Sequence, residues 1–567
     1  MDIRNALKES IASSLNGLGI SVEAQNVPLE HPAELKNGDY SSGVALQYAK
    51  QAGTAPQTLA IKVAEEIAVT EAVKISVAKP GFINFYLSTE LLTSAIEEAR
   101  TQDMWGSNTL YKGKKIMVEY TDPNPFKEFH IGHLMSNAIG ESIARLMQFS
   151  GANVTRANYQ GDVGPHVAKS IWGRMQNPKM SWGKAYTYGT QNYANNKPTI
   201  DIINKKIYER SDKEINAIYD KGVIQTLKGF EKIYKQLGMD PVYSDNKDQI
   251  YFDFYFYESH TWKDGVELVK KYTPKIFTPS KGAIVFCAEE YDKKLHTRVF
   301  VTSQGLPTYE AKELGLVKAK QERYRDRFKV DFDSSITITA NEQSEYFKVV
   351  MKAAELIFPD LSSKIKHISH GMMRFAKGKM SSRKGNVITS KSLLANLKKV
   401  AKIRAAESRA ENKEELARQV AVAAIKYQIL KQASGKDIIF DRERALSLEG
   451  DSGPYLQYAH ARACAIGEKA KEQNVVAKVD AHAEPNDLMR LLHRFPESVE
   501  YAAAHSEPHL LTNYLLEFAA TFNTWYAQVH VLDGTPEAAH KVALVDAVRR
   551  TLKNGLWILG IPAPERM

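Results

Sequence analysis

The chain contains very little cysteine and no long apolar stretch. Only Cys287 and Cys464 occur among its 567 residues, which excludes a Cys₄ zinc site and makes a disulfide framework implausible. No stretch approaches the roughly 18 to 20 uninterrupted apolar residues that cross a bilayer, and residues 1–4 do not open the apolar segment of a secretion signal. We therefore expect a protein of the reducing cytoplasm that neither spans a membrane nor is exported by that route.

Internal repeats and low-complexity tracts are also missing. Apolar residues make up 43% and charged residues 25% of the chain, a globular composition that argues against a disordered, collagen-like or coiled-coil chain. At roughly 100 to 200 residues per domain, the length corresponds to about three to five domains.

Three regions of the chain differ in their hydrophobic pattern. Residues 1–105 alternate helical patterns with short extended runs and predict a small α+β domain. Within residues 106–395, an apolar run at 116–120 leads through a Pro-rich turn into an amphipathic helix, which is how an α/β nucleotide-binding fold begins. Strands that would complete its sheet are predicted at 250–252, 283–286, 298–301 and 336–339, and a mostly helical insertion at about 172–250.

The strands are predicted to stop after about residue 396. Apolar residues then recur at helical spacing within 416–430, 511–525 and 542–559, so residues 396–567 are predicted to form a helical bundle. The expected fold is a multidomain α/β protein. A Rossmann-like parallel-sheet catalytic domain would be flanked by an N-terminal α+β domain and a C-terminal all-α helical bundle.

Basic residues outnumber acidic residues by 76 to 66, and they are unevenly distributed. Residues 361–410 contain thirteen lysines and arginines but a single acidic residue, Glu407. So basic a segment favours a phosphate-bearing partner, either a nucleotide or a nucleic acid, although charged runs are more often solvated surface.

The segment 121–133 lies between the first strand of the α/β region and its helix, and it ends in His130-Ile131-Gly132-His133. Free backbone N–H groups and the helix dipole favour an anion at this position. Gly132 lets a ligand approach the backbone, and the two imidazoles can donate hydrogen bonds to phosphate oxygens. The alternative is that the two histidines only cap the helix or lie on the surface.

Residues 378–386 form a second candidate segment, with glycines near both ends, two hydroxyls and the cations Lys379, Arg383 and Lys384. A moving loop of this kind can bring positive charge to a phosphate as negative charge develops in the transition state. The glycine spacing of a Walker A loop is absent. Taken alone, such a loop is more often plain charged surface.

Together the two segments resemble the signature motifs of class I aminoacyl-tRNA synthetases. His-Ile-Gly-His at 130–133 resembles their first motif, and Lys-Met-Ser-Ser-Arg at 379–383 resembles their second. The order of the two motifs and their separation of about 250 residues also agree with that class.

Further motifs resemble the arginyl-tRNA synthetases along almost the whole chain. Asn124, Lys127 and residues 130–134 resemble that family's form of the first motif, and Gly161-Asp162-Val163-Gly164 resembles its G-D-x-G. The family also has an additional N-terminal domain that contacts the tRNA elbow, and an anticodon-binding domain. Segments that resemble these two domains lie at 37–40, 80–85, 454–462 and 559–567.

The resemblance implies an arginine–tRNA ligase, a monomer with domains at 1–105, 106–395 and 396–567. It would join L-arginine to tRNA(Arg) through arginyl-adenylate, with ATP and its Mg²⁺ as substrate and no metal ligand from the protein. The implied catalytic residues are His130, His133, Lys127, Lys379 and Arg383. ATP would bind at His130, Gly132, His133, Lys379, Met380 and Ser381. Arginine would bind at Asn124, Glu258, Tyr309, Glu313 and Gln343, and tRNA at Tyr455, Gln457, Tyr458 and Arg462.

Three positions depart from the family's usual pattern. Glu313 stands where the family usually has Asp, so the carboxylate is kept but lies one methylene further out. Ser382 stands where many synthetases have the lysine of the second motif, and Met135 where the family often has Arg. In the family, loss of that lysine often accompanies a lysine just before the first motif, and Lys127 occupies that place.

Two other functions stay open on the residues alone. One is a different nucleotidyl-transfer enzyme, either another class I synthetase or a small-molecule adenylyltransferase, although the long helical C-terminal region argues against the latter. The other is a degenerate synthetase that only binds RNA or regulates. Retention of both histidines, of Lys379 and of the polar pocket residues argues against decay.

Overall fold

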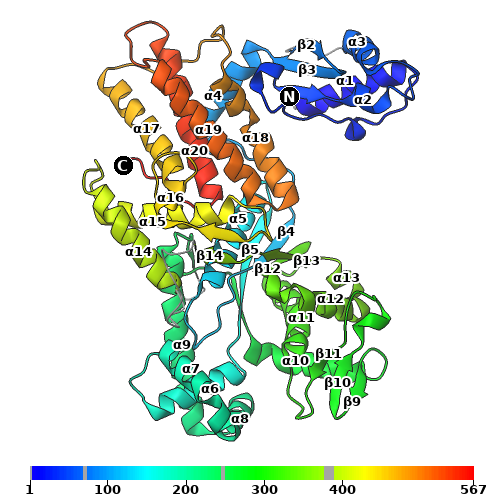
Figure 1. Ribbon diagram of the computed structural model, residues 1–567, viewed down its shortest axis with the longest axis vertical. Helices are drawn as coiled ribbons and strands as arrows, with labels where there is room; N and C mark the ends of the chain where they lie inside the picture. Colours follow the sequence, from blue (N-terminus) through cyan, green and yellow to red (C-terminus); the bar gives the residue numbers. More distant parts are fainter. Residues whose placement is uncertain (1–2, 68–72, 244–248, 376–388) are drawn as a thin grey trace. The chain divides into compact units, whose positions relative to one another are not determined.

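The computed structural model describes residues 3–67, 73–243, 249–375 and 389–567, and Figure 1 shows that most of them are helical. Two compact units can be distinguished by their internal contacts. The first comprises Met1–Gly106, Ala459–Glu497 and Glu517–Asn554, and the second Ser107–Tyr458, Ser498–Leu516 and Gly555–Met567. In none of the described helices do length and apolarity suffice for a membrane crossing.

The N-terminal part is a small antiparallel sheet packed with helices, which confirms the predicted α+β domain. Strands β2 and β3 are joined by the turn at Pro80-Gly81, with Ala78 opposite Phe82. Leu7, Ile11 and Leu15 recur every four residues on the buried face of the first helix. The strands, in the order β1-β3-β2, are β1 (Tyr40–Ser42), β2 (Val73–Ala78) and β3 (Phe82–Leu87), and the helices are α1 (Ile3–Gly17), α2 (Val44–Tyr48), α3 (Pro56–Glu66) and α4 (Thr89–Thr101).

A five-stranded parallel sheet forms the centre of the second unit and confirms the predicted Rossmann-like domain. Its order is β13-β12-β4-β5-β8, with β4 (Lys115–Glu119), β5 (Asn153–Gln160), β8 (Phe254–Tyr257), β12 (Ser334–Ala340) and β13 (Ile365–His370). From the central β4 the chain first adds β5 and β8 on one side, and it then returns to add β12 and β13 on the other. The order therefore reverses between β4 and β12, and ligands of such sheets bind at the carboxyl ends of the strands at that point.

Helices cover this sheet and carry the inserted segment. Its connecting helices are α5 (Ile131–Phe149), α6 (Pro165–Gln176), α10 (Glu258–Lys271), α11 (Tyr309–Phe328), α12 (Ser344–Ile357) and α13 (Pro359–Ser362). The insertion consists mainly of α7 (Trp182–Gln191), α8 (Tyr193–Glu209) and α9 (Lys213–Gln236), which confirms the prediction of mostly helix. Phe126, from the segment before α5, is buried in the same cluster as Ile171 of α6 and Ile200 of α8.

For some of the predicted strands, the predicted pairing was wrong. The runs at 283–286 and 298–301 form β10 (Ala283–Phe286) and β11 (Arg298–Val301), which pair antiparallel in a separate sheet with β9 (Thr278–Ser280). The run at 250–252 contributes only to the short β7 (Gln249–Ile250), which pairs with β6 (Val242–Tyr243). Apolar alternation indicates a strand but not its neighbour, because pairing depends on residues far away in the sequence. Strands β5 and β13 were not predicted.

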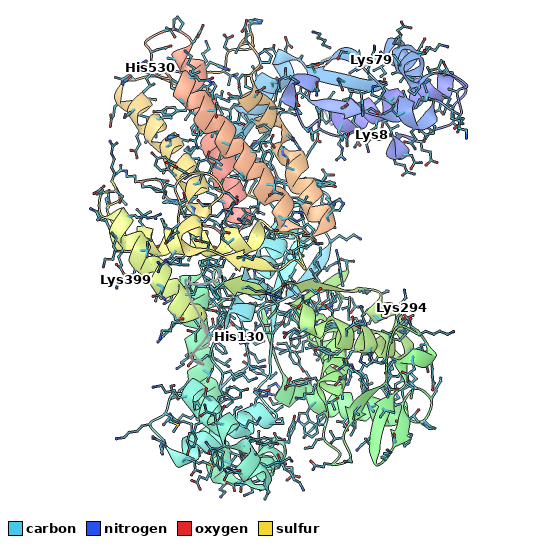
Figure 2. All side chains as sticks on the ribbon, viewed as in Figure 1. Lys8, Lys79, His130, Lys294, Lys399 and His530 are labelled. Atoms are coloured by element: carbon cyan, nitrogen blue, oxygen red, sulfur yellow. The ribbon has the colours of Figure 1, made fainter. Side chains whose placement is uncertain are left out.

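The last third of the chain confirms the three predicted helical runs. Its helices are α14 (Ser390–Ala405), α15 (Lys413–Leu430), α16 (Arg442–Ala445), α17 (Gly453–Glu472), α18 (Asp487–His505), α19 (Pro508–Gln528) and α20 (Ala538–Ile558). The prediction that strands stop near 396 was wrong, because β15 (Ile438–Phe440) pairs in parallel with β14 (Met373–Phe375). Three residues are too few for a periodic signal. Figure 2 labels Lys399, which is an exposed cation of the basic helix α14.

A buried ion cluster joins α5 to the sheet. The carboxylate of Glu141 accepts hydrogen bonds from Nε of Arg145 (2.7 Å) and from Nε of Arg156 on β5 (2.9 Å), and also from the hydroxyl of Tyr120. Burial by itself would raise the pKa of Glu141, but the guanidinium groups of Arg156 and Arg145 hold it well below the usual range. The carboxylate is therefore ionised in the folded protein at neutral pH.

We predict that Glu141→Gln lowers the free energy of unfolding by roughly 3 to 5 kcal/mol at pH 7, because the guanidinium group of Arg156 loses its ion-pair partner and that of Arg145 keeps only the exposed Asp240. The stabilisation by Glu141 is present above the carboxyl group's unfolded pKa and is lost as the pH falls toward the depressed folded value, so the two proteins should converge in acid. Urea unfolding at several pH values measures this. Glu355→Gln, which removes an exposed ion pair with Lys352, is the matched control and should cost less than about 1 kcal/mol.

Candidate active site

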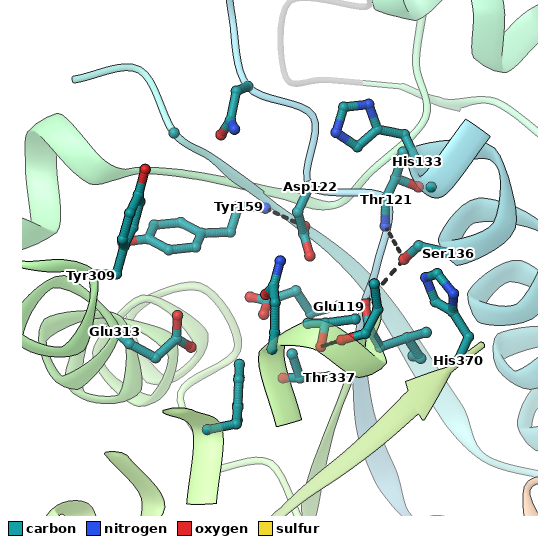
Figure 3. A pocket seen from close by; sticks show the side chains of 18 of the residues that line it. Glu119, Thr121, Asp122, His133, Ser136, Tyr159, Tyr309, Glu313, Thr337 and His370 are labelled. Carbon is teal, nitrogen blue, oxygen red and sulfur yellow. Dashed lines mark hydrogen bonds between the residues drawn. The ribbon is translucent and has the colours of Figure 1, made fainter. Parts of the chain in front are cut away.

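A cavity of about 400 Å³ lies at the reversal point of the parallel sheet. Its side chains come from the loop after β4, the start of α5, the end of β12 and the helices α10 and α11, and Figure 3 shows many of them from close by. The volume is within the range of small-molecule sites. The chain thus brings several segments together where a parallel sheet of this order binds ligands.

Two histidines cap the helix that begins at this cavity. The side chain of His130 accepts the backbone N–H of His133, and Nδ1 of His133 accepts the backbone N–H of His130 (3.3 Å). Their rings stack with centroids 3.5 Å apart. In a neutral imidazole with one nitrogen accepting, the other nitrogen carries the proton. Each ring therefore keeps one N–H donor at the positive end of the helix dipole.

Both histidines are held in the neutral form. Removal of water by the surrounding protein lowers the pKa of His130 to about 4, although one side of its ring is exposed, and the nearby cation of Lys127 adds to this effect. Burial is also the main cause that lowers the pKa of His133 well below its ordinary value, and His130, Lys127 and His370 add to this effect. A phosphate at this site would thus meet dipolar donors from the histidines, and positive charge would come from other residues.

The loop between β4 and α5 has an unusual backbone. Thr121 and Asp122 adopt left-handed φ angles of 79° and 44°, which residues other than glycine rarely adopt. The carboxylate of Asp122 accepts the backbone N–H of Tyr159 on β5 (2.7 Å), and Thr121 donates its N–H to Oγ of Ser136 on α5 (2.9 Å; Figure 3). These contacts hold the loop in its strained conformation, as is typical of strained backbone at functional sites.

Several carboxylates line the cavity. Glu258, the first residue of α10, pairs with the buried Nζ of Lys312 (2.7 Å). Burial raises the pKa of Glu258, and Lys312 only partly offsets this. On α11, Tyr309 has its ring facing Nζ of Lys312 (4.9 Å), and burial together with the charge of Glu119 raises the pKa of Glu313 to about 8.

The structure brings most of the expected substrate residues into this one cavity. Lys127 is not part of its lining; its Nζ lies 5.1 Å from the centre of the Tyr186 ring. The second-motif residues Lys379, Met380, Ser381 and Arg383, together with Ser382, lie outside the described residues. The lining includes Asn124, His130, Gly132, His133, Glu258, Tyr309, Glu313 and Gln343.

The expected tRNA-binding residues lie on α17 and are not part of the cavity lining. Tyr455 and Tyr458 are half-buried, and Arg462 donates a hydrogen bond to Asn523. Gln457 is fully buried, and its Nε2 donates to the carbonyl oxygens of Gln419 (3.3 Å) and Pro562 (2.8 Å). The Gln457 side chain is therefore committed to holding α17 against neighbouring segments.

The residues alone did not single out several groups that line the cavity. Asp122 lies three residues after the end of a buried parallel strand, where ligand groups gather, and this signal could have identified it. Tyr159 and His370 lie on β5 and β13, which were among the strands that were not predicted, so no signal pointed to these two residues. Further lining residues of this kind are Glu119, Thr337, Thr339 and Tyr346.

A Rossmann-like sheet with a histidine pair at the first helix and a carboxylate-lined substrate cavity defines a class I aminoacyl-tRNA synthetase. Comparison with sequence families agrees along the chain. Residues 5–87 match the arginyl tRNA synthetase N terminal domain, residues 95–442 the catalytic domain of class I (R) tRNA synthetases, and residues 456–567 the DALR anticodon binding domain. The chain belongs to the arginyl-tRNA synthetase family.

Individual relatives are similar over their full length. The arginine–tRNA ligase of Clostridium perfringens is 30% identical, with all of both chains covered, and that of Clostridioides difficile is 29% identical over 100% of this chain and 99% of its own. Among solved structures, Thermus thermophilus arginyl-tRNA synthetase superposes with a TM-score of 0.81 at 27% identity over 100% of both chains. The Plasmodium falciparum enzyme shares the fold at a TM-score of 0.78 and 20% identity, over 100% of this chain and 99% of its own.

We predict that Gly161→Ala weakens arginine binding about tenfold or more. A Cβ at Gly161 would lie 2.0 Å from Oδ1 of Asn124 and 3.5 Å from Oε1 of Glu258, so the Asn124 amide has to leave its place in the cavity. Because only a side-chain end must move, the free energy of unfolding should change by less than about 1 kcal/mol. Gly229→Ala on α9, where a Cβ meets nothing within 4 Å, is the control. Equal arginine affinity in the two variants would contradict the assignment of Asn124.

Proposed function

We propose that the chain performs its family's reaction, the ATP-dependent ligation of L-arginine to tRNA(Arg), in two steps at this cavity. In the first, a carboxylate oxygen of arginine attacks the α-phosphorus of ATP, which forms arginyl-adenylate and releases pyrophosphate. In the second, the 3′-terminal ribose hydroxyl of the tRNA takes the arginyl group and AMP leaves. The observation that carries this proposal is the juxtaposition, in one cavity, of neutral imidazole donors and an excess of carboxylates.

Catalysis in this scheme consists of positioning and charge stabilisation. His130 and His133 hydrogen-bond the phosphates at the start of α5, where Gly132 permits close approach. Asn124 and Gln343 face the α-amino and α-carboxylate end of arginine. Glu258, Tyr309 and Glu313 face its guanidinium group, which carboxylates bind in a fork geometry.

Cations complete the phosphate site. We assign Lys379, Met380, Ser381 and Arg383 to binding and stabilising the phosphates of ATP, with Lys127 supplying further positive charge. The Mg²⁺ that accompanies ATP would be held chiefly by those phosphates.

The tRNA would be bound by the regions that precede and follow the catalytic domain along the chain. The proposed domains are residues 1–105, which contact the tRNA elbow, 106–395, which are catalytic, and 396–567, which bind the anticodon; the three matched family ranges support this division. Tyr455, Tyr458 and Arg462 would contact the RNA, and Gln457 would position their helix. The scarcity of cysteine supports a cytoplasmic location, and the resemblance supports a monomer.

ATP–pyrophosphate exchange with each amino acid, with and without tRNA, tests this function directly. Exchange stimulated by arginine alone among the amino acids is the expected result. Exchange with another amino acid would indicate a different synthetase. A complete lack of exchange, with retained tRNA binding, would indicate an RNA-binding or regulatory protein.

We predict that His130→Ala or Lys379→Ala lowers the rate of adenylate formation by roughly 2 to 4 kcal/mol of transition-state stabilisation. Binding of arginine and tRNA should change little, because the lost contacts strengthen only as charge develops on the transferring phosphate. Single-turnover kinetics measures both. His482→Ala, on an exposed loop, is the control; adenylation by either active-site variant at the rate of this control would remove that residue from the catalytic set.

We predict that Lys127→Ala is as damaging to pyrophosphate exchange as Lys379→Ala. Burial lowers the pKa of Lys127, the negative charge of Glu258 opposes this, and Lys127 in turn depresses the pKa values of His130 and His133, so its cation acts on this site. Adding Ser382→Lys should restore part of the lost rate if the two positions compensate. A double-mutant cycle with coupling below about 0.5 kcal/mol would rule out compensation.

A further inference from the structure

In the described part of the chain, the inserted helices α7, α8 and α9 add no side chain to the lining of the cavity, yet they pack against the loop that leads to the histidine pair. Figure 1 shows α6, α7, α8 and α9 grouped together. From residue 219 onward, the buried residues of α9 are spaced three or four positions apart, so they lie on one face of the helix. Each of them meets Phe126 or Phe129 of the loop; they are Tyr219, Gly222, Thr226, Phe230 and Tyr234.

Phe126 is the first of the two residues by which the insertion holds the loop. Its φ angle of 69° is left-handed, which a bulky residue rarely adopts. The fully buried ring meets Trp182 of α7 edge-on, with ring centroids 5.0 Å apart, and lies 5.8 Å from the ring of Tyr219. Its backbone N–H donates to Oγ1 of Thr226 (3.4 Å). The insertion thus contacts both the side chain and the backbone of Phe126, and these contacts stabilise its strained conformation.

Gly222 makes the close approach of α9 to Phe126 possible. A Cβ at Gly222 would lie 2.2 Å from Cε1 of Phe126 and 2.7 Å from Cζ2 of Trp182. Both distances are shorter than any van der Waals contact, so a larger residue would displace the Phe126 ring. That ring is enclosed by Trp182 and Tyr219 in a buried cluster and has little room to move.

Phe129 is the second residue that α9 holds. Its ring lies 5.9 Å from the ring of Phe230 and 6.1 Å from that of Tyr234. Its carbonyl oxygen accepts the N–H of Ser390 (3.2 Å), and its ring lies 5.3 Å from the ring of His133. The same face of α9 therefore fixes the loop on both sides of residues 127 and 128, directly before the histidine pair.

Lys127 lies between these two fixed residues, and its side chain also contacts the insertion. Its ammonium group is 5.1 Å from the centre of the Tyr186 ring on α7, a distance at which the ring face attracts a cation. After burial, the charge of Lys127 is among the causes that lower the pKa values of His130 and His133, so the cation acts on the histidine pair. The insertion therefore determines where this positive charge lies relative to the histidines.

We propose that the insertion positions Lys127 for catalysis: α9 fixes the loop at Phe126 and Phe129, and Tyr186 of α7 orients the ammonium group. Gly222 and Tyr186 are positioning residues, because they act through Lys127 and neither is among the described residues that line the cavity. The inference rests on the proposed function, in which Lys127 supplies positive charge to the phosphates of ATP. A displacement of about 1 Å in such a group can lower a rate as much as a hundredfold.

Single-turnover formation of arginyl-adenylate by the full-length protein, in the presence of tRNA(Arg), tests the proposal. Gly222→Ala displaces the Phe126 ring and with it the loop, so it should lower the rate about tenfold or more. Arginine affinity should change by less than about twofold, because arginine binds elsewhere in the cavity. Gly229→Ala is the matched control: it makes the same change on the same helix, but its Cβ meets nothing within 4 Å, and it should keep the wild-type rate.

A double-mutant cycle with Lys127→Ala separates positioning from a merely structural effect. If Gly222 acts through Lys127, adding Gly222→Ala to Lys127→Ala should lower the rate further by less than about twofold. A general disturbance of the active site would instead lower the rate by the same factor in both backgrounds. Urea unfolding of each variant establishes that the proteins compared are folded.

Substitutions of Tyr186 give a second, milder test. Tyr186→Leu removes the ring that faces the ammonium group of Lys127 and should lower the rate about two- to fivefold, whereas Tyr186→Phe keeps the ring and should retain the wild-type rate. Tyr186 is only half-buried, so neither change should prevent folding. In the Lys127→Ala background, Tyr186→Leu should have no further effect.

The outcomes separate this inference from the proposed function. A wild type that forms no arginyl-adenylate would overturn the proposed function, and the inference with it. An active wild type would overturn the positioning role alone in either of two cases: a folded Gly222→Ala variant works at the wild-type rate, or its loss is the same with and without Lys127. If Gly222→Ala does not fold, the Tyr186 variants decide by the same two criteria.

Discussion

The buried carboxylate of Glu141 holds the elements on which the active site depends. It lies on α5, and its partners are Arg145 of the same helix, Arg156 of β5 and Tyr120 directly after β4. The loop proposed to bind phosphate runs from the end of β4 to the start of α5, so this one ion cluster holds both of the elements that the loop connects. That support allows Thr121 and Asp122 to keep left-handed backbone angles that an isolated loop would relax.

Removal from water also sets the charge state of the side chains that line the cavity. Groups removed from water lose their charge unless a partner compensates, so the two histidines are neutral and the pKa values of Asp122 and Glu313, which have no lysine partner among the described residues, are raised. Under the proposed function the substrates would supply the missing charges: the phosphates of ATP would meet N–H donors and a helix dipole, and the guanidinium group of arginine would meet carboxylates. The charge of the cavity therefore depends on the exclusion of water as much as on the residues that line it.

Much of the architecture could be predicted because its signals are local. The strand at 116–120 and its helix have a strong apolar period, and so do α15, α19 and α20, which all form as expected. The sheet was less predictable. β10 and β11 were assigned to the parallel sheet but pair with each other, and β5 and β13 went unnoticed because half-polar strands carry a weaker pattern. Glu258, Tyr309 and Glu313 came from family resemblance, since nothing local distinguishes them from surface charges or core aromatics.

The sequence by itself determined the class of fold, the histidine segment at 130–133 and the family, because these depend on short-range periodicity and on motifs read along the chain. Only the tertiary structure decided how the carboxylates are matched with cations. Lys312 meets Glu258 across 54 positions, and Lys320 meets Glu119 across a still longer separation. Asp122 and Glu313 are left without a cation in the described chain for the same reason: an ion pair requires two side chains to meet within a few ångströms in a water-poor cavity, and that distance is set by the packing of α10 and α11 against the sheet.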